Sequence, residues 1–198
     1  MTRGIVLGLT LDQVAARAVQ LGAPDFVDGY YQLSGHNGGK DPTAADPFDR
    51  WPFKGADGET HEARTADCIG GAAWAGGFDR YQPDRFKLRG WDGWINTDSM
   101  LEDARGHATC FALLPAPVRG CFLVAPTGSP GFERCGHITT IHTVPADFAM
   151  DNPASWKALL GTDVASRGSS RANTTHDASW WFAARHHGAG FVRSIMTP

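Results

Sequence analysis

The sequence predicts an α+β fold in which helices near the N-terminus pack on a small antiparallel sheet. Helical periodicity comes early in the 198-residue chain, and short apolar runs typical of strands follow in its second half. The 24 glycines and 12 prolines imply many turns and argue against an all-helical fold. With 42% hydrophobic residues, a chain of this length is expected to form a single domain, 1–198, around one sizeable core.

The first predicted helix begins after Thr10 and ends at Gly22. Thr10 and Gln13 have the spacing of a capping box, and apolar residues recur at the helical period between Thr10 and Gly22. The segment 25–65 that follows is rich in Gly, Pro and Asp and has no sustained period, yet it holds several aromatic residues. We therefore expect a long ordered loop or flap there.

Two further helices are predicted from their capping residues. Asp67 is expected to cap a helix that starts at Cys68, runs through small residues and ends at the Gly76–Gly77 pair. A short helix is expected to start near Asn96.

The second half of the chain is predicted to supply the sheet. The runs CFLVAP (121–126) and GHITTIHTVP (136–145) are typical of strands, the first buried and the second alternating. A helix-like piece follows at 152–161, and further strands are expected at 162–165 and 191–195.

The charge and hydropathy of the chain limit the classes of partner that are expected. The formal net charge is -3, and basic residues are scattered, which argues against a nucleic-acid partner. Asp12 and Gln13 interrupt the N-terminal apolar stretch, so neither a secretory signal peptide nor a membrane span is predicted, and synthesis in the cytoplasm is expected. The composition leaves the oligomeric state open.

The four cysteines are expected to be reduced, because no export signal is predicted. A zinc site built from Cys110, Cys121, Cys135 and His142 is disfavoured, since their spacing lacks the close pairs that bring ligands to one ion. No metal or organic cofactor is therefore expected.

Cys68 is the candidate for chemistry. A thiol attacks a carbonyl carbon as the thiolate, and a helix N-terminus stabilises negative charge, so this position is expected to lower the pKa of Cys68. A nucleophilic thiol also needs a base, and His137 is the best placed histidine because Gly136 gives access and a strand holds it rigidly. The alternatives are a small buried core cysteine and a structural histidine.

These motifs resemble those of the NlpC-type, papain-like cell-wall cysteine peptidases. In that family an Asp-Cys pair opens a helix of small residues, and a Gly-His-Ile motif later begins a strand. Here the motifs stand as DCIGG (67–71), with Trp74 close by, and GHI (136–138). Ile69 replaces the serine that usually follows the cysteine, which indicates a divergent member.

The resemblance implies a papain-like fold and a catalytic triad. Cys68 would be the nucleophile, His137 the general base and acid, and Asp163 the residue that orients the imidazole. The backbone N–H of Cys68 would contribute to the oxyanion hole. The expected substrate-binding residues are Tyr31, Asp67 and Trp74.

The resemblance also implies peptidoglycan stem peptides as the substrate. A phage lysin, a virion-associated peptidase or an effector would fit, acting at the wall after lysis, within a virion or through dedicated secretion. Two alternatives stay open: a non-catalytic module that binds the wall or a protein through the aromatic loop, and an amidase with a non-wall substrate.

Overall fold

The computed structural model describes residues 4–23, 29–30, 43, 49–54, 59–88, 90–91, 93–164 and 173–198. Within these ranges it is a mixed structure of helices and antiparallel sheet, which confirms the predicted α+β class. The elements are α1 (Leu11–Leu21), β1 (Gly29–Tyr30), β2 (Asp49–Lys54), β3 (Thr60–Ala66), α2 (Cys68–Gly76), α3 (Thr97–Glu102), the π-helical turn η1 (Asp103–His107), β4 (Phe111–Leu114), β5 (Phe122–Ala125), β6 (His137–Thr143), α4 (Pro153–Ala158), β7 (Leu160–Val164), β8 (Asn173–Asp177), α5 (Trp181–Ala184) and β9 (Gly190–Ser194).

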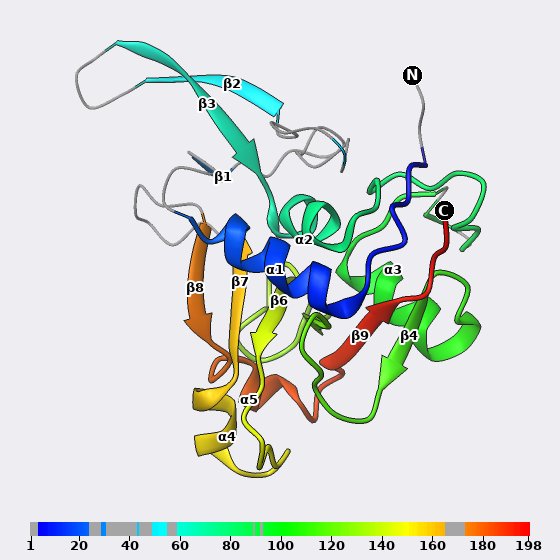
Figure 1. The fold of residues 1–198 in the computed structure, drawn as a ribbon, viewed down its shortest axis with the longest axis vertical. Helices are drawn as coiled ribbons and strands as arrows, with labels where there is room; N and C mark the ends of the chain where they lie inside the picture. Colours follow the sequence, from blue (N-terminus) through cyan, green and yellow to red (C-terminus); the bar gives the residue numbers. More distant parts are fainter. Residues whose placement is uncertain are drawn as a thin grey trace.

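The main sheet has six strands in the order β4-β9-β5-β6-β7-β8, and every neighbouring pair is antiparallel. β5 and β6 form its centre, and β7 lies between β6 and the edge strand β8, with Thr140 of β6 opposite Thr162 of β7. β8 forms one edge, and β4 forms the other (Figure 1). The strands predicted at 121–126, 136–145, 162–165 and 191–195 correspond to β5, β6, β7 and β9.

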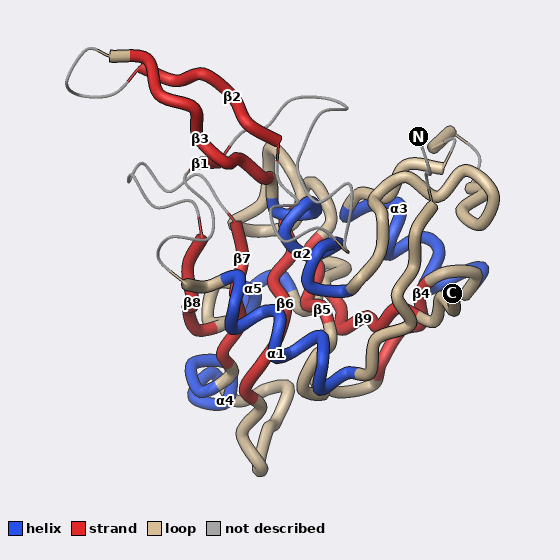
Figure 2. The backbone as a smooth tube through the Cα atoms, turned by 45° about the horizontal axis from the view of Figure 1, so that its top comes forward, coloured by secondary structure: helices blue, strands red, loops and turns tan. Residues whose placement is uncertain are grey.

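The two faces of the main sheet are covered by different helices. α1 and α2 lie across one face, where Val14 and Ile69 belong to one core cluster with Val124 and Ile138 of the sheet (Figure 2). Trp181 of α5 belongs to a second cluster, together with strand residues that point the opposite way. The strand residues of this second cluster are Leu123, Ala125, Ile141 and Phe191.

The first helix forms as its sequence predicts. The Thr10 side chain accepts a hydrogen bond from Gln13 N, and the Gln13 side chain accepts one from Thr10 N, which completes the capping box. Its buried positions recur at the helical period and face the sheet: Val14, Ala15, Ala18 and Leu21.

The segment 25–65 contains strands that its composition did not predict. β2 and β3 pair antiparallel from Asp49↔Thr65 to Lys54↔Thr60, and β1 pairs parallel with β3. These strands project beyond the main sheet in Figure 1, and β3 runs directly into α2. Backbone pairing stabilises a strand without requiring an apolar alternation, which explains why the sequence pattern missed it.

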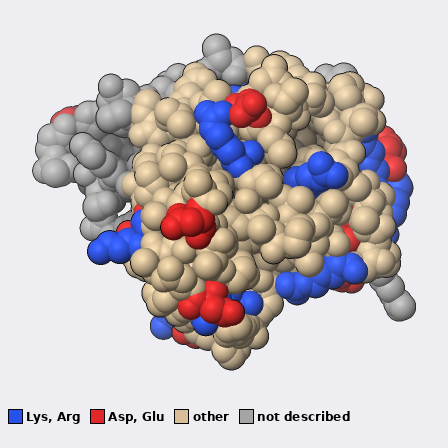
Figure 3. Space-filling model, turned by 60° about the horizontal axis from the view of Figure 1, so that its bottom comes forward, with Lys and Arg blue, Asp and Glu red and all other residues tan. Residues whose placement is uncertain are grey.

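Charged side chains are interspersed on the surface. On the face seen in Figure 3, basic and acidic residues alternate with uncharged ones and form no continuous basic surface. Among the residues that the structure describes, no helix combines the length and apolar character that a membrane crossing requires.

Candidate active site

The N-terminus of α2 is fixed by Asp67, as its sequence predicts. Oδ1 of Asp67 accepts a hydrogen bond of 2.7 Å from Gly70 N, which caps the helix. Oδ2 accepts one of 2.8 Å from Nη1 of Arg80, and Nε of Arg80 donates to the Ile95 carbonyl. These contacts hold Cys68, the first residue of α2, at a fixed point on the rim of the sheet.

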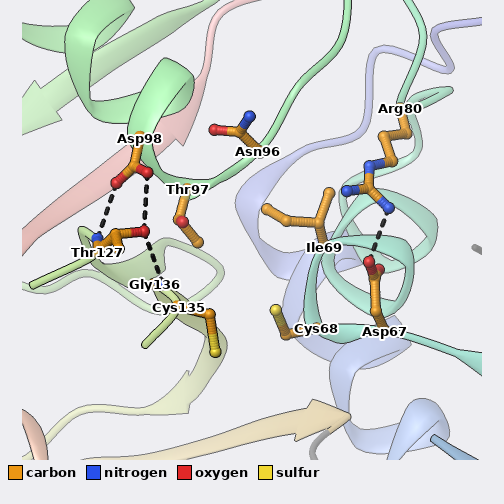
Figure 4. Close-up of a pocket in the computed structure, with 10 residues that line it drawn as sticks. All are labelled: Asp67, Cys68, Ile69, Arg80, Asn96, Thr97, Asp98, Thr127, Cys135 and Gly136. Carbon is orange, nitrogen blue, oxygen red and sulfur yellow. Dashed lines mark hydrogen bonds and ion pairs between the residues drawn. The ribbon is translucent and has the colours of Figure 1, made fainter. Parts of the chain in front are cut away.

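A cavity of about 210 Å³ opens beside Cys68 (Figure 4). Cys68 comes from α2 on one side, and Cys135 and Gly136 come from the segment before β6 on the other. The lining is mostly polar and consists of Asp67, Cys68, Ile69, Arg80, Asn96, Thr97, Asp98, Thr127, Cys135 and Gly136. This volume lies below the roughly 300–1,000 Å³ of sites for drug-sized ligands, so the cavity suits one small residue or group.

The wall opposite Cys68 is held by hydrogen bonds to Asp98. Its carboxylate accepts from the backbone N–H and the hydroxyl of Thr127, each at 2.8 Å. Thr127 Oγ1 in turn accepts from Gly136 N at 3.1 Å (Figure 4). Gly136 has no space for a side chain, because a Cβ there would lie 2.7 Å from the Ala125 carbonyl oxygen. The position of His137, the next residue, is therefore tightly constrained.

His137 and Asp163 form a hydrogen-bonded pair. Nε2 of His137 lies 2.6 Å from Oδ2 of Asp163. The antiparallel register of β6 and β7 explains the contact: side chains at alternate positions share a face, and the register places these two residues on the same face as diagonal neighbours. Asp163, the carboxylate expected to orient the imidazole, is thus in hydrogen-bond contact with His137.

Aromatic rings surround the pair on the α5 side of the sheet. The His137 ring stacks against Phe132 and Trp181, with ring centroids 5.9 and 5.6 Å apart. The Asp163 side chain is fully buried, and that of His137 is 13% exposed. This shielding keeps water from competing for the hydrogen bond between them.

Asp163 is ionised despite its burial. Burial alone would raise its pKa, but hydrogen bonds and charge interactions with His137 and His176 outweigh it and hold the pKa of Asp163 well below its usual range. An ionised carboxylate only accepts, so Nε2 of His137 must donate. Nδ1 of a neutral His137 is then the nitrogen that can take up a proton.

The pKa of the Cys68 thiol is raised, whereas the sequence predicted that it would be lowered. Burial, followed by the negative charges of Asp67 and Asp163, raises the pKa of Cys68, although Arg80 and a hydrogen bond from Ile69 N–H act in the other direction. The helix N-terminus contributes as expected, but it is outweighed. Cys68 is therefore a neutral thiol in the resting structure.

The structure brings some of the predicted site residues together and separates others. Asp67 lines the cavity with Cys68. No hydrogen bond joins Cys68 to His137, both of which are described: α2 covers one face of the sheet, whereas His137 points toward α5 on the other. Trp74 lies in a core cluster with Leu21 and Val164 instead of the cavity, and Tyr31 lies outside the described residues.

Several residues of this region were not found from the sequence. Arg80, Asn96, Asp98 and Thr127 line the cavity, and His176 contacts Asp163. The helix start near Asn96 was predicted, so the cavity wall at Asn96–Asp98 could have been inferred from it. Arg80 and His176 belong to no local sequence motif and reach the site only through tertiary packing, so the sequence did not indicate them.

Comparisons with known proteins do not assign this chain: no protein-family model, curated protein or solved structure matches it. No group of three or more His, Cys, Asp and Glu residues in the described ranges is arranged to hold a metal ion. The fold and the site together define an α+β protein with a buried histidine–carboxylate pair beside a thiol-lined cavity.

Proposed function

We propose that this protein is a papain-like cysteine hydrolase of the NlpC type that cleaves amide bonds in peptidoglycan stem peptides. The observation that carries the proposal is the 2.6 Å contact between His137 Nε2 and Asp163, directly after a segment that lines one cavity with Cys68. A carboxylate that orients an imidazole is one part of the arrangement that nucleophilic catalysis by cysteine requires, and a thiol within reach of the imidazole is the other.

The reaction would begin from the neutral thiol. As the Cys68 sulfur attacks the carbonyl carbon of the substrate, its proton passes to Nδ1 of His137, and Asp163 stabilises the imidazolium that forms. The imidazolium then protonates the leaving amine, which departs and leaves a thioester on Cys68. His137 next takes a proton from water, and the hydroxide that adds to the thioester releases the acid and restores the thiol.

The tetrahedral intermediates carry a negative oxygen that needs donors. The backbone N–H of Cys68, at the first position of α2, has no acceptor within the helix and can serve as one donor. The scheme requires a rearrangement on substrate binding that brings the Cys68 thiol within reach of His137 Nδ1, because in this structure α2 covers one face of the sheet and the His137 ring packs against Trp181 on the other.

Two features support a small peptide as the substrate. The cavity is mostly polar and has room for a single residue, which fits the short, charged peptides of the bacterial wall better than a folded protein segment. The Asp-Cys and Gly-His-Ile motifs resemble those of wall peptidases and direct the choice to peptidoglycan.

Digestion of purified sacculi tests the proposal. Wild-type protein is expected to release fragments with new amine termini, identified by mass spectrometry, and Cys68→Ala is expected to release none. Cys110→Ala is the matched control, because it removes a thiol that does not line the cavity and should leave the fragments unchanged. If Cys68→Ala releases the wild-type fragments, or the wild type releases none, the wall-hydrolase proposal is wrong.

The raised pKa of Cys68 favours a second candidate, a non-catalytic module that binds the wall through the same cavity. Such a module would sediment with sacculi without releasing fragments, and Cys68→Ala would sediment equally well. A third outcome separates an amidase with another substrate: no binding to sacculi, but covalent capture of Cys68 by a peptide-like electrophile.

A further inference from the structure

His176 contacts the same carboxylate oxygen as His137. Its Nε2 lies 2.9 Å from Oδ2 of Asp163, and its side chain is 12% exposed. His176 belongs to β8, on the side of β7 away from β6. The proposed reaction makes no use of this second histidine, so its contact with the orienting carboxylate needs an explanation.

The strand register explains why His137 and His176 both reach Asp163. Thr174 of β8 lies opposite Asp163, so His176, two residues further on, shares its face as a diagonal neighbour. His137 is the diagonal neighbour on the other side, because Thr140 lies opposite Thr162. Asp163 is thus held between two imidazoles from two different strands.

Both ring nitrogens of His176 face oxygen acceptors. Nδ1 lies 2.7 Å from the backbone carbonyl oxygen of Asp177, which can only accept. Nε2 faces the ionised carboxylate of Asp163, which also only accepts. Through Nε2–H the His176 ring donates to the Asp163 carboxylate, which is the contact that matters for the orientation of Asp163.

Trp181 covers the His176 ring. The rings of His176 and Trp181 are nearly parallel, at 7°, with centroids 5.5 Å apart, and Trp181 is fully buried. The same indole lies 5.6 Å from His137, so one side chain packs both imidazoles around Asp163.

We infer that His176 is a positioning residue of this site, which holds the Asp163 carboxylate so that it faces and orients His137. The inference rests on the proposed hydrolase function. Without the donor on the β8 side, the Asp163 carboxylate would lose one of the hydrogen bonds that hold it toward His137, and its buried charge would be less well satisfied. His176 acts through Asp163 and does not touch the substrate.

The test compares His176→Leu, His176→Gln and the control His142→Gln. His142 lies on β6 like His137 and bonds to Thr143, not to Asp163. With sacculus peptides as substrate, His176→Leu is expected to lower kcat about 10- to 100-fold, the usual range for partners that orient a functional histidine, with KM unchanged. His176→Gln should recover part of the loss because its amide N–H can donate to Asp163, and His142→Gln should match the wild type.

A spectroscopic measurement keeps the inference independent of activity and of the folding of His176→Leu. Proton–nitrogen NMR of the wild-type imidazoles, assigned with His176→Gln, is expected to show a hydrogen on Nε2 of His176, the nitrogen that faces Asp163. A bare Nε2 on His176, or a folded His176→Leu with wild-type kcat, overturns the inference and leaves the proposed function standing. A wild type that cannot cleave sacculi overturns the function, whereas the NMR signals still report whether His176 holds Asp163.

Discussion

The carboxylate of Asp163 and the imidazole of His137 meet at 2.6 Å, on neighbouring strands of one sheet and behind a layer of aromatic rings. Two rigid strands set the positions of both groups, so the contact costs little conformational entropy at the moment of reaction. Because Nε2 is committed to Asp163, the imidazole has a defined tautomer and one available basic nitrogen. The geometry therefore prepares His137 to accept a proton.

Replacing Asp163 with Asn tests this pair. The Asn side chain keeps the shape but permits the other histidine tautomer, and the corresponding change in a serine triad lowers kcat about 10⁴-fold. We expect a loss of about 10³- to 10⁴-fold in the rate of peptide release, with binding to sacculi retained. A rate within tenfold of the wild type would show that Asp163 does not orient the base.

The stability of the protein should depend on pH through the same carboxylate. The pKa of Asp163 is lower in the folded chain than its ordinary value of 3.8, so the unfolded chain binds its proton first. The stabilisation is therefore complete above that ordinary value and is lost as the pH falls toward the lowered folded pKa. Urea unfolding of wild type and Asp163→Asn should differ most near neutral pH and converge in acid; a constant difference would contradict this origin.

Local signals in the sequence predicted much of the fold. The capping box at Thr10 and the cap at Asp67 predicted the starts of α1 and α2, and apolar runs predicted the central strands β5 and β6. β8 (NTTHD) was missed because it is polar and is stabilised by pairing with β7 at the sheet edge, and β4 (FALL) was missed because four apolar residues alone do not distinguish a strand from a buried helical segment. Edge strands need less apolar surface than central ones, so their sequences carry a weaker signal.

The candidate site was predicted in part for a similar reason. Cys68 and His137 belong to local motifs, and Asp163 was found from the strand after them. His176 and Arg80 reach the site through tertiary packing alone, and burial outweighs the effect of the helix N-terminus on the Cys68 thiol. Burial and distant charges depend on the whole fold and cannot be derived from neighbouring residues.

The four thiols should differ in their reactivity. Cys135 is exposed, whereas Cys68 is half-buried with a raised pKa, and burial raises the pKa of Cys110 and of Cys121 to about 12. Iodoacetamide at neutral pH is expected to label Cys135 first, and labelling of Cys68 should accelerate only as the solution becomes alkaline. Peptide mapping of a time course measures this order, with Cys135→Ser as control. Faster labelling of Cys68 than of Cys135 at neutral pH would mean that its thiol is activated.

Asp103 should stabilise the fold at a distance from the chemistry. Its fully buried carboxylate accepts hydrogen bonds from the backbone N–H groups of Thr109, Cys110 and Phe111, at 3.1, 2.8 and 2.8 Å. Asp103→Ala would leave these donors without their acceptor, and we expect a loss of about 3 kcal/mol in the free energy of unfolding. Asp103→Asn keeps one acceptor oxygen and should lose less. Both variants should retain the wild-type kcat below their melting temperatures, and a change in kcat would place Asp103 in the site.

Gly71 controls how closely the helix that carries Cys68 approaches the strand that carries Asp163. A Cβ on Gly71 would lie 2.7 Å from Cγ2 of Val164, the residue after Asp163, and 3.2 Å from Cδ2 of Leu21. In Gly71→Ala, the gain in helix propensity of about 1 kcal/mol is opposed by an overpacking cost of about 1–3 kcal/mol. We expect a small net loss of stability and a larger loss of activity, because α2 must move away from β7 and take Cys68 with it.

Gly106→Ala is the matched control for this prediction. Gly106 also lies in a helical turn, η1, but a Cβ there would meet no atom within 4 Å. Thermal melts and rates of peptide release for both variants separate the two effects, since Gly106→Ala gains propensity without a clash. Equal activity of Gly71→Ala and Gly106→Ala would mean that the distance between α2 and β7 does not govern the reaction, and that the Cys68 thiol works independently of the carboxylate behind His137.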